Sequence, residues 1–367
     1  MKKKFTIAAV GDLAPLRSVT DCQPAVNKVW DLLRNADLSI ANLELPLTNS
    51  EVRVDKAITL KASPSIAPSL MEAGIDAVTV ANNHALDFGA TGLLETMEVL
   101  KASGVHAVGG GINMEAASQP LFMEINGMRV AILGFCSALP TGYAAGTNRP
   151  GIAPIRAHAR FYIDNMTLDE QPGISPWVET TVNQGDLEYA CNIVESAKKE
   201  SDFVIVNMHW GIPNGWCAAF QGPLADYQQP LGHALIDAGA DIILGHHPHV
   251  IHGIEKYKHG LIAYSLGNFL FHSMGEDHEM KLTVAYPPYK VDSLETGEAR
   301  EAVVVELEME NNRLVSVRLL PIHLNSKGEP EFLNPEASER VLKRLEQQSL
   351  TLGLPISVEK QVGSFYL

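Results

Sequence analysis

Cysteine is scarce in this chain of 367 residues, which contains only four. No two of them have the Cys-x-x-Cys spacing that is typical of zinc knuckles and thiol redox sites. Scattered cysteines fit a protein of a reducing compartment better than a disulfide scaffold. We therefore expect each one to be a small hydrophobic residue in the core, namely Cys22, Cys136, Cys191 and Cys217.

Positive charge is also in short supply. The chain has 28 Lys and Arg residues against 43 Asp and Glu residues, a formal net charge of -15. Such a surface repels nucleic acid and anionic lipid, so we expect no nucleic-acid partner. It also disfavours a polyanionic substrate, unless a metal ion or local basic residues reverse the field.

Long hydrophobic runs are missing. No stretch approaches the ~20 apolar residues that cross a membrane. The basic start, Met1–Lys4, resembles the beginning of a signal peptide, but the apolar run Phe5–Val10 that follows is shorter than the roughly 7–15 residues required. We interpret this run as a first β-strand and predict a cytoplasmic protein without a membrane span.

What the chain does have is an alternation of short apolar runs and amphipathic stretches, and 46% of its residues are hydrophobic. This rhythm predicts an α/β fold with a parallel or mixed sheet and helices on its faces. Strands are predicted over Phe5–Val10, Leu38–Ala41, Ala77–Val80, Val105–Val108, Phe203–Met208, Ile242–Leu244, Leu261–Tyr264, Ala302–Glu308 and Leu314–Leu320. Helices are predicted over Ala25–Arg34, Pro64–Ala73, Gly89–Ala102, Asp186–Lys199, Tyr227–Ala238 and Pro335–Gln348. Between Leu121–Ile125 and Met128–Phe135, Asn126-Gly127 predicts a type I′ hairpin turn.

Residues 136–184 show no sustained periodicity and contain five prolines. A loop of this length is uncommon unless it is functional, so we expect a lid or substrate-binding excursion. Three of its arginines, Arg149, Arg156 and Arg160, could bind carboxylates. We expect residues 1–325 to form one domain, with 326–367 as a C-terminal helical extension packed on it.

Polar residues with the character of metal ligands follow five of the predicted strands. In open α/β sheets, ligands bind beyond the carboxyl ends of the strands, so we expect these residues to converge on one site. They are Asp12, Asn42 with Glu44, Asn82-Asn83-His84, His209, and His247 with His249.

The last of these segments, Gly245-His246-His247-Pro248-His249-Val250, is the most informative. Strand side chains alternate from face to face, so two histidines at positions i and i+2 are expected to point the same way. Neutral imidazole suits borderline transition metals. His247 and His249 are therefore predicted to bind a metal from one short loop.

Six segments together resemble the successive motifs of the CapA family, also called the poly-γ-glutamate capsule biosynthesis family. This family belongs to the calcineurin-like metallophosphoesterase superfamily, and the resemblance covers residues 5–272. It implies a four-layer α/β/β/α sandwich of two mixed sheets, with a metal centre on the loops at one edge. The segments are Gly11-Asp12, Ala41–Glu44, Ala81–Gly89, His209–Gly211, Gly245–Val250 and Tyr264–Phe269.

The resemblance also implies roles for individual residues. Asp12 and His249 would ligate one metal ion, and Glu44 would bridge to a second ion held by Asn83, His209 and His247. His84 would assist the leaving group. A further set would contact the substrate or support the ligands: Asn42, His246, Trp210, Ser265 and Asn268.

The chain departs from the family pattern at two points. The superfamily's Asp-x-His motif is Asp12-Leu13-Ala14 here, so the first metal ion lacks one ligand. The family's acid after His-Trp-Gly is also absent, because the stretch is Ile212–Trp216 without a carboxylate. The second departure weakens the expectation that the substrate is a poly-γ-glutamate capsule.

Together these features predict a hydrolase that uses metal-activated water on a small-molecule or peptide-like substrate, with a γ-glutamyl or peptide-like amide suggested by the family. One or two divalent ions are expected, and Mn²⁺, Fe²⁺ and Zn²⁺ all suit the ligand set. Phosphoester hydrolysis, peptide epimerisation and a non-catalytic, metal-stabilised role in polymer assembly or export are the alternatives. The sequence indicates no oligomeric state.

Overall fold

The protein is described from a computed structural model, which covers residues 4–56, 58–174, 176–211, 223–272, 297–311 and 313–366. Its larger sheet has ten strands, with β15 paired to β1 and β18 paired to β17 beside the main path β19-β20-β17-β16-β1-β2-β3-β4. These strands are β1 (Lys4–Ala14), β2 (Leu38–Leu43), β3 (Ala77–Thr79), β4 (His106–Val108), β15 (Asn268–Phe271), β16 (Glu301–Glu310), β17 (Arg313–Leu324), β18 (Pro330–Phe332), β19 (Ser357–Glu359) and β20 (Val362–Tyr366).

The second sheet has six strands in the order β13-β14-β12-β11-β7-β6. They are β6 (Leu121–Ile125), β7 (Met128–Cys136), β11 (Phe203–His209), β12 (Ile242–His246), β13 (Ile251–Tyr257) and β14 (Gly260–Leu266). Strands β7, β11, β12 and β14 are parallel to one another. A separate two-residue pair, β5 (Gly110–Gly111) with β8 (Gly151–Ile152), lies outside both sheets.

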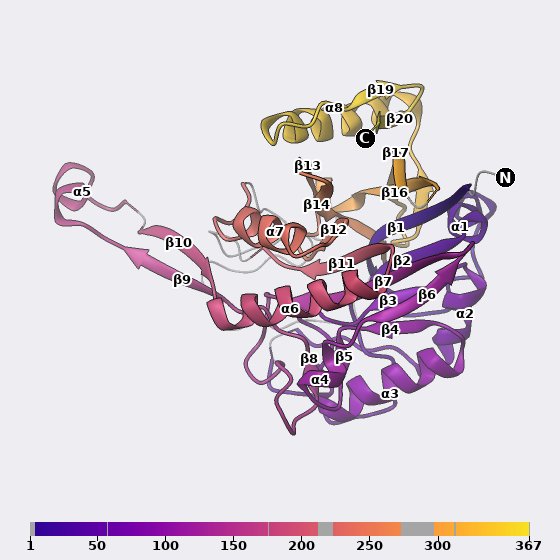
Figure 1. Cartoon of the computed structure of the whole chain (residues 1–367), viewed down its shortest axis with the longest axis horizontal. Coiled ribbons are helices and arrows are strands. Elements are labelled where there is room, and N and C mark those ends of the chain that lie inside the picture. The colour runs from indigo at the N-terminus through magenta and orange to yellow at the C-terminus, as the bar shows by residue number, and fades with distance from the viewer. Residues whose placement is uncertain are drawn as a thin grey trace.

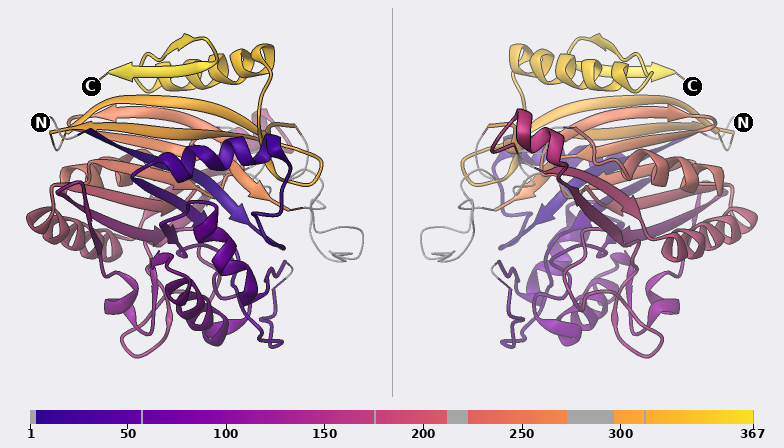
Figure 2. Two further views of the ribbon diagram at one scale, coloured as in Figure 1. Left: turned by 90° about the vertical axis from the view of Figure 1, so that its right-hand side faces the viewer. Right: turned by 90° about the vertical axis from the view of Figure 1, so that its left-hand side faces the viewer.

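The two sheets pack face to face, with helices on both outer faces (Figures 1 and 2). The core between the sheets includes Ile7 of β1 and Ile205 of β11. The neighbouring residues, Ala8 and Val206, face the outer helices instead. Both faces of these strands are therefore covered, which explains why they appear in the sequence as continuous apolar runs.

The helices that cover the larger sheet are α1 (Pro24–Asn35), α2 (Ala67–Glu72), which follows the short 3-10 turn Pro64–Ile66, and α3 (Gly89–Ala102). Helices α6 (Gln184–Glu200) and α7 (Gln228–Asp237) cover the six-stranded sheet. The molecule is thus a four-layer α/β/β/α sandwich of two mixed sheets, as predicted. A second short 3-10 turn, Gly297–Arg300, precedes β16, and α4 (Met114–Ala117) is a single turn.

The predicted hairpin is confirmed. Strands β6 and β7 pair in antiparallel fashion from Ile125↔Met128 outward. Asn126 and Gly127 have φ angles of 50° and 78°. Positive φ at both central positions is what a type I′ turn requires.

Part of the segment 136–184 is regular, which its sequence did not indicate. Residues 157–182 contain β9 (Ala157–Tyr162), α5 (Asn165–Glu170) and β10 (Trp177–Val182), and the two strands form their own antiparallel ribbon. Figure 1 shows this ribbon projecting from the body of the molecule, with α5 at its tip. A lid role for the rest of the segment stays a prediction.

The C-terminal segment contains strands as well as the expected helix. Helix α8 (Pro335–Thr351) buries Val341, Leu342 and Leu345 in the core between the sheets, along one edge of the sandwich (Figure 2). Strands β18 and β20 extend the larger sheet by pairing with β17. No helix in the described ranges is long and apolar enough to cross a membrane.

Candidate metal centre

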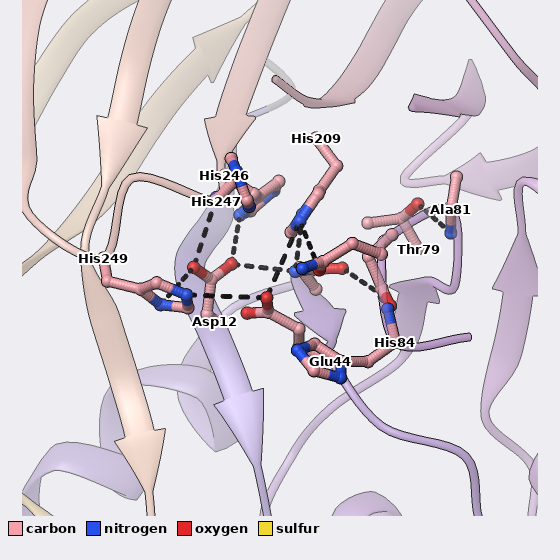
Figure 3. Close-up of polar contacts among 12 residues, drawn as sticks. Asp12, Glu44, Thr79, Ala81, His84, His209, His246, His247 and His249 are labelled. Atoms are coloured by element: carbon pink, nitrogen blue, oxygen red, sulfur yellow. Dashed lines mark hydrogen bonds and ion pairs between the residues drawn. The ribbon is translucent and has the colours of Figure 1, made fainter. Parts of the chain in front are cut away.

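Residues from both sheets meet at the carboxyl ends of the parallel strands (Figure 3). Strand β1 positions Asp12, and its neighbour β2 positions Asn42 directly opposite. Strand β11 ends at His209 and the adjacent strand β12 ends at His246, and these two residues are also paired. The site is therefore built where the two sheets face each other at one edge, as the sequence predicts for the ends of parallel strands.

Asp12 is fully buried and lies at the centre of this cluster. Its Oδ1 accepts a hydrogen bond from Asn42 Nδ2 at 2.8 Å and lies 3.3 Å from His246 Nδ1. Its Oδ2 accepts from the backbone N–H of His247 at 3.3 Å. Burial alone would raise the pKa of Asp12, but the contact with His246 and the nearby charge of His249 outweigh it and lower the pKa. Asp12 is therefore ionised at neutral pH.

Glu44 is also fully buried, but neither of its oxygens has a hydrogen-bond partner among the described residues. Its Oε1 lies 3.6 Å from His209 Nε2 and 3.7 Å from His249 Nε2. Burial, together with the charge of Asp12, raises the pKa of Glu44 well above its ordinary value. The carboxyl group is thus held where its charged form is unfavourable without a cation.

Two overlapping groups of side chains have the geometry to hold a metal ion. One group is Glu44, His209 and His247, and the other is Asp12, Glu44 and His249. Within each group the ligand atoms lie within 4.8 Å of one another. Glu44 is the residue that both groups share.

The chemistry of these residues fits a divalent metal. Buried polar groups without partners cost about 1–3 kcal/mol each, and here both Glu44 oxygens and His247 Nδ1 lack hydrogen bonds within the described ranges. Burial lowers the pKa of His209 well below its usual value and that of His247 to about 3, so both imidazoles are neutral and able to ligate. Mixed nitrogen and oxygen donors suit Mn²⁺, Fe²⁺ or Zn²⁺.

The two loop histidines reach the site through a left-handed turn and not as part of a strand, so strand alternation is not what brings them together. Strand β12 ends at His246, before either residue. His247 and His249 have φ angles of 98° and 59°, a region that residues with a side chain rarely occupy. Asn268 Oδ1, 2.8 Å from His249 Nδ1, holds the second ring in place. Such strain persists where the surroundings enforce it and is common at functional sites.

Asn83, the remaining predicted ligand, lies beside the group formed by Glu44, His209 and His247. Its Oδ1 is 3.0 Å from His209 Nε2. His246 is buried against Asp12, and neither of its ring nitrogens has a hydrogen bond to a described residue. It belongs to neither of the two ligand groups and contacts Asp12 instead.

Two other predicted residues lie farther from the ligand groups. The indole of Trp210 stacks on Tyr264 and donates from Nε1 to the Tyr264 carbonyl oxygen at 2.9 Å. Ser265 contacts the backbone N–H of Gly267 at 3.4 Å. Both support the strands that carry the site, and neither contacts a ligand atom in the described contacts.

His84 is held by a network that sequence reasoning missed in part. Its Nδ1 lies 2.6 Å from Asp87 Oδ2, and Lys56 Nζ donates to Asp87 Oδ1 at 2.8 Å. Tyr143 donates to the same oxygen at 2.8 Å. Burial and the charge of Lys56 lower the pKa of His84. Asp87 lies within a motif quoted above, but no local pattern marked Lys56 or Tyr143, which come from distant loops.

The predicted carboxylate-binding role of the loop arginines is wrong for Arg156. Its guanidinium group already binds Asp186: Nε donates to Oδ2 at 2.7 Å and Nη2 donates to Oδ1 at 2.6 Å. Arg149 donates to the carbonyl oxygen of Ala144 at 2.8 Å. The stretch Ile212–Trp216, which lacks the family's acid, lies outside the described residues.

The fold defines the chain as an α/β protein in which two mixed sheets pack face to face between layers of helices. The family model described as bacterial capsule synthesis protein PGA_cap matches residues 6–273, and the chain belongs to this family. Capsule biosynthesis protein CapA of Bacillus anthracis is 32% identical over 282 residues, which cover 73% of this chain and 60% of that protein. PGA biosynthesis protein CapA of Bacillus subtilis (strain 168) is 31% identical over 246 residues, covering 66% of this chain and 55% of that protein.

The chain thus spans little more than half the length of these two relatives. A hypothetical protein from Thermus thermophilus is similar in structure, with a TM-score of 0.46 and 16% identity. That similarity covers 86% of this chain and 98% of the other.

Proposed function

We propose that this chain is a metal-dependent hydrolase that uses metal-activated water to cleave an amide of the γ-glutamyl or peptide-like type. The observation that carries the proposal is Glu44, a buried carboxyl without hydrogen bonds in the described chain that is shared by two groups of ligands. Because both groups include Glu44, its carboxylate would be shared if each group held a metal ion. A buried acid that makes no hydrogen bond is difficult to explain by folding alone.

Asp12, Glu44 and His249 would hold one ion, and Glu44, Asn83, His209 and His247 the other. When bound, such ions lower the pKa of a bound water toward 7 and polarise the bond to be cleaved. The chain's own contribution is to orient the ligands. Asn42 fixes Asp12, Asn268 fixes His249, and the left-handed turn places one loop histidine in each of the two groups.

His84 would move a proton. Its Nδ1 faces the Asp87 carboxylate, an acceptor, so the proton of the neutral ring resides on Nδ1 and Nε2 is the nitrogen left to exchange protons. The lowered pKa means that the free ring is neutral near pH 7 and accepts a proton first. Asp87 then stabilises the imidazolium, which can return that proton to a leaving group.

The amide substrate is inferred from the family. One relative is named for PGA biosynthesis and another for capsule biosynthesis. A polyanionic chain would meet a protein of net charge -15, so the metal ions and Lys56 would be the local positive charges at the site. Phosphoester hydrolysis is the alternative chemistry for the same ligands.

The test uses the purified full chain loaded separately with Mn²⁺, Fe²⁺ and Zn²⁺. Metal content is measured first, because less than about 0.3 ion per chain after loading would rule out the metal centre. A γ-glutamyl oligomer is then followed by mass spectrometry, and we expect cleavage that Glu44→Gln and His84→Ala both reduce by at least about 100-fold.

The other outcomes separate the alternatives. Turnover of an aryl phosphate ester without amide cleavage would replace the amide proposal with phosphoester hydrolysis. Deuterium uptake into an intact peptide would indicate epimerisation. Equal, negligible turnover by wild type and His84→Ala with full metal content would indicate a non-catalytic component.

A further inference from the structure

The ribbon formed by residues 157–182, which we call the arm, is a separate antiparallel pair of strands. Strands β9 and β10 pair from Ala157↔Val182 to Tyr162↔Trp177, and neither pairs with another strand in the described chain. In Figure 1 the arm extends away from the two main sheets. An isolated two-stranded ribbon is marginally stable in water, so a structure of this kind favours a partner.

Exposed apolar side chains are concentrated on the arm. The described chain has thirteen large hydrophobic residues that are exposed, and seven of them lie between residues 161 and 177. Single exposed hydrophobic residues are normal on a protein surface, but a concentration of them in one short projecting segment marks an interaction site. The seven are Phe161, Tyr162, Ile163, Met166, Leu168, Ile174 and Trp177.

We propose that the arm is a self-association surface, on which the arm of a second copy of this chain docks. In such a dimer the two arms would pack against each other across a twofold axis, with the exposed apolar side chains of each arm covering those of the other. In that arrangement each arm presents the same surface to the other. This inference is independent of the proposed hydrolase activity.

The exposed area is what a stable dimer needs. Phe161, Met166 and Trp177 are 69%, 76% and 72% exposed. Taking about 200 Å² for a fully exposed large side chain, the seven residues leave roughly 800 Å² open in total. This area is spread over the tip and both faces of the ribbon, because Phe161 lies on one face and Tyr162, paired with Trp177, on the other. That is about one partner's share of a standard protein interface.

The charge of the arm argues against a lipid surface as the occupant. It carries one arginine, Arg160, against four acids: Asp164, Asp169, Glu170 and Glu179. Two of the acids lie in α5 at the tip, which would have to approach the lipid first. Anionic membranes would repel this tip, whereas a second arm can place Arg160 near an acid of its partner.

Sedimentation velocity on the full chain, over a range of concentrations up to about 100 μM, tests the inference. We expect wild type to sediment at twice the chain mass. The triple variant Phe161→Ser, Met166→Ser, Trp177→Ser is expected to be a monomer. Because these side chains are exposed, the variant should keep the circular dichroism spectrum and melting temperature of the folded body.

The matched control replaces three exposed hydrophobic residues elsewhere, Val52→Ser, Leu350→Ser and Tyr366→Ser, which are 79%, 62% and 85% exposed. The control should remain a dimer. A monomeric wild type at every concentration would overturn the inference, as would an arm variant that still dimerises. A monomer that binds phosphatidylcholine vesicles through the arm would overturn it in favour of lipid.

Discussion

At Glu44, burial destabilises the charged carboxylate, which is the form that binding a metal ion requires. The side chain is fully buried and lacks hydrogen bonds to the described residues, and its raised pKa shows that the charged form is unfavourable there. The buried carboxylate of Asp12 is instead stabilised by its neighbours, because Asn42, His246 and the backbone of His247 surround its oxygens. Two carboxylates so close together therefore differ in what they need from a metal ion.

We predict that Glu44→Gln leaves the metal-free protein as stable as wild type or more stable by about 1 kcal/mol, because it removes a buried acid without partners. The same variant should lose most of the stabilisation that Mn²⁺ or Zn²⁺ provides. Denaturant unfolding in chelator and in excess metal measures both effects. Glu51→Gln, at a glutamate whose side chain is 87% exposed, is the control and should respond to metal like wild type.

At the scale of single elements, glycine lets the strands that carry ligands approach one another. A Cβ added at Gly11 would lie 1.9 Å from the carbonyl oxygen of Gly267, and one at Gly245 would lie 2.1 Å from that of Tyr264. Gly11 directly precedes Asp12, whose backbone N–H donates to the Gly267 carbonyl oxygen at 3.0 Å. Close packing of β1 against the segment before β15 therefore fixes the first ligand.

Gly11→Ala is predicted to lower the free energy of unfolding by about 3 kcal/mol or more, because backbone atoms rather than a flexible side chain must move. Gly185→Ala is the matched control. It lies in α6, and its nearest atom, Asn183 Oδ1, is 3.5 Å from the added Cβ. There alanine should stabilise the protein by about 0.5–1 kcal/mol through its helix propensity. Equal effects of the two substitutions on urea unfolding would contradict this explanation.

For the molecule as a whole, buried neutral histidines make the metal-free fold sensitive to acid. Burial lowers the pKa of His247 to about 3 and that of His272 to about 4, and it lowers that of His209 well below 6.5. As the pH falls below about 6.5, the unfolded chain binds protons at these positions and the folded chain does not. The free energy of unfolding must therefore fall with pH.

Each such histidine contributes a slope of about 1.4 kcal/mol per pH unit between 6.5 and its folded pKa. We predict that His272→Asn removes one such contribution between pH 6 and pH 5, while its amide oxygen can still accept the Leu16 N–H that His272 Nδ1 accepts at 3.0 Å. Urea unfolding of the metal-free protein at several pH values measures the slopes. Identical slopes for wild type and variant would show that His272 does not titrate on unfolding.

The sequence by itself determined most of the elements and predicted which residues meet at the candidate site. Apolar periodicity marks β1, β11, β12 and the main helices, because the local pattern of burial repeats along each element. The motif residues follow those strands directly, so their convergence could be predicted from the sheet alone. The short strands β13 and β15 and the ribbon of the arm could not be predicted, since their pairing depends on partners far along the chain.

Only the tertiary structure decided how the candidate site is arranged. The position of Glu44 between two groups of ligands, the contacts of Lys56 and Tyr143 with Asp87, and the left-handed turn at His247 all depend on long-range packing. Sequence spacing carries no information about such contacts. The physical reason is that neighbours in the sequence determine the face of a strand or helix on which a side chain lies. Its ionisation state and its contacts depend on segments that meet only after folding.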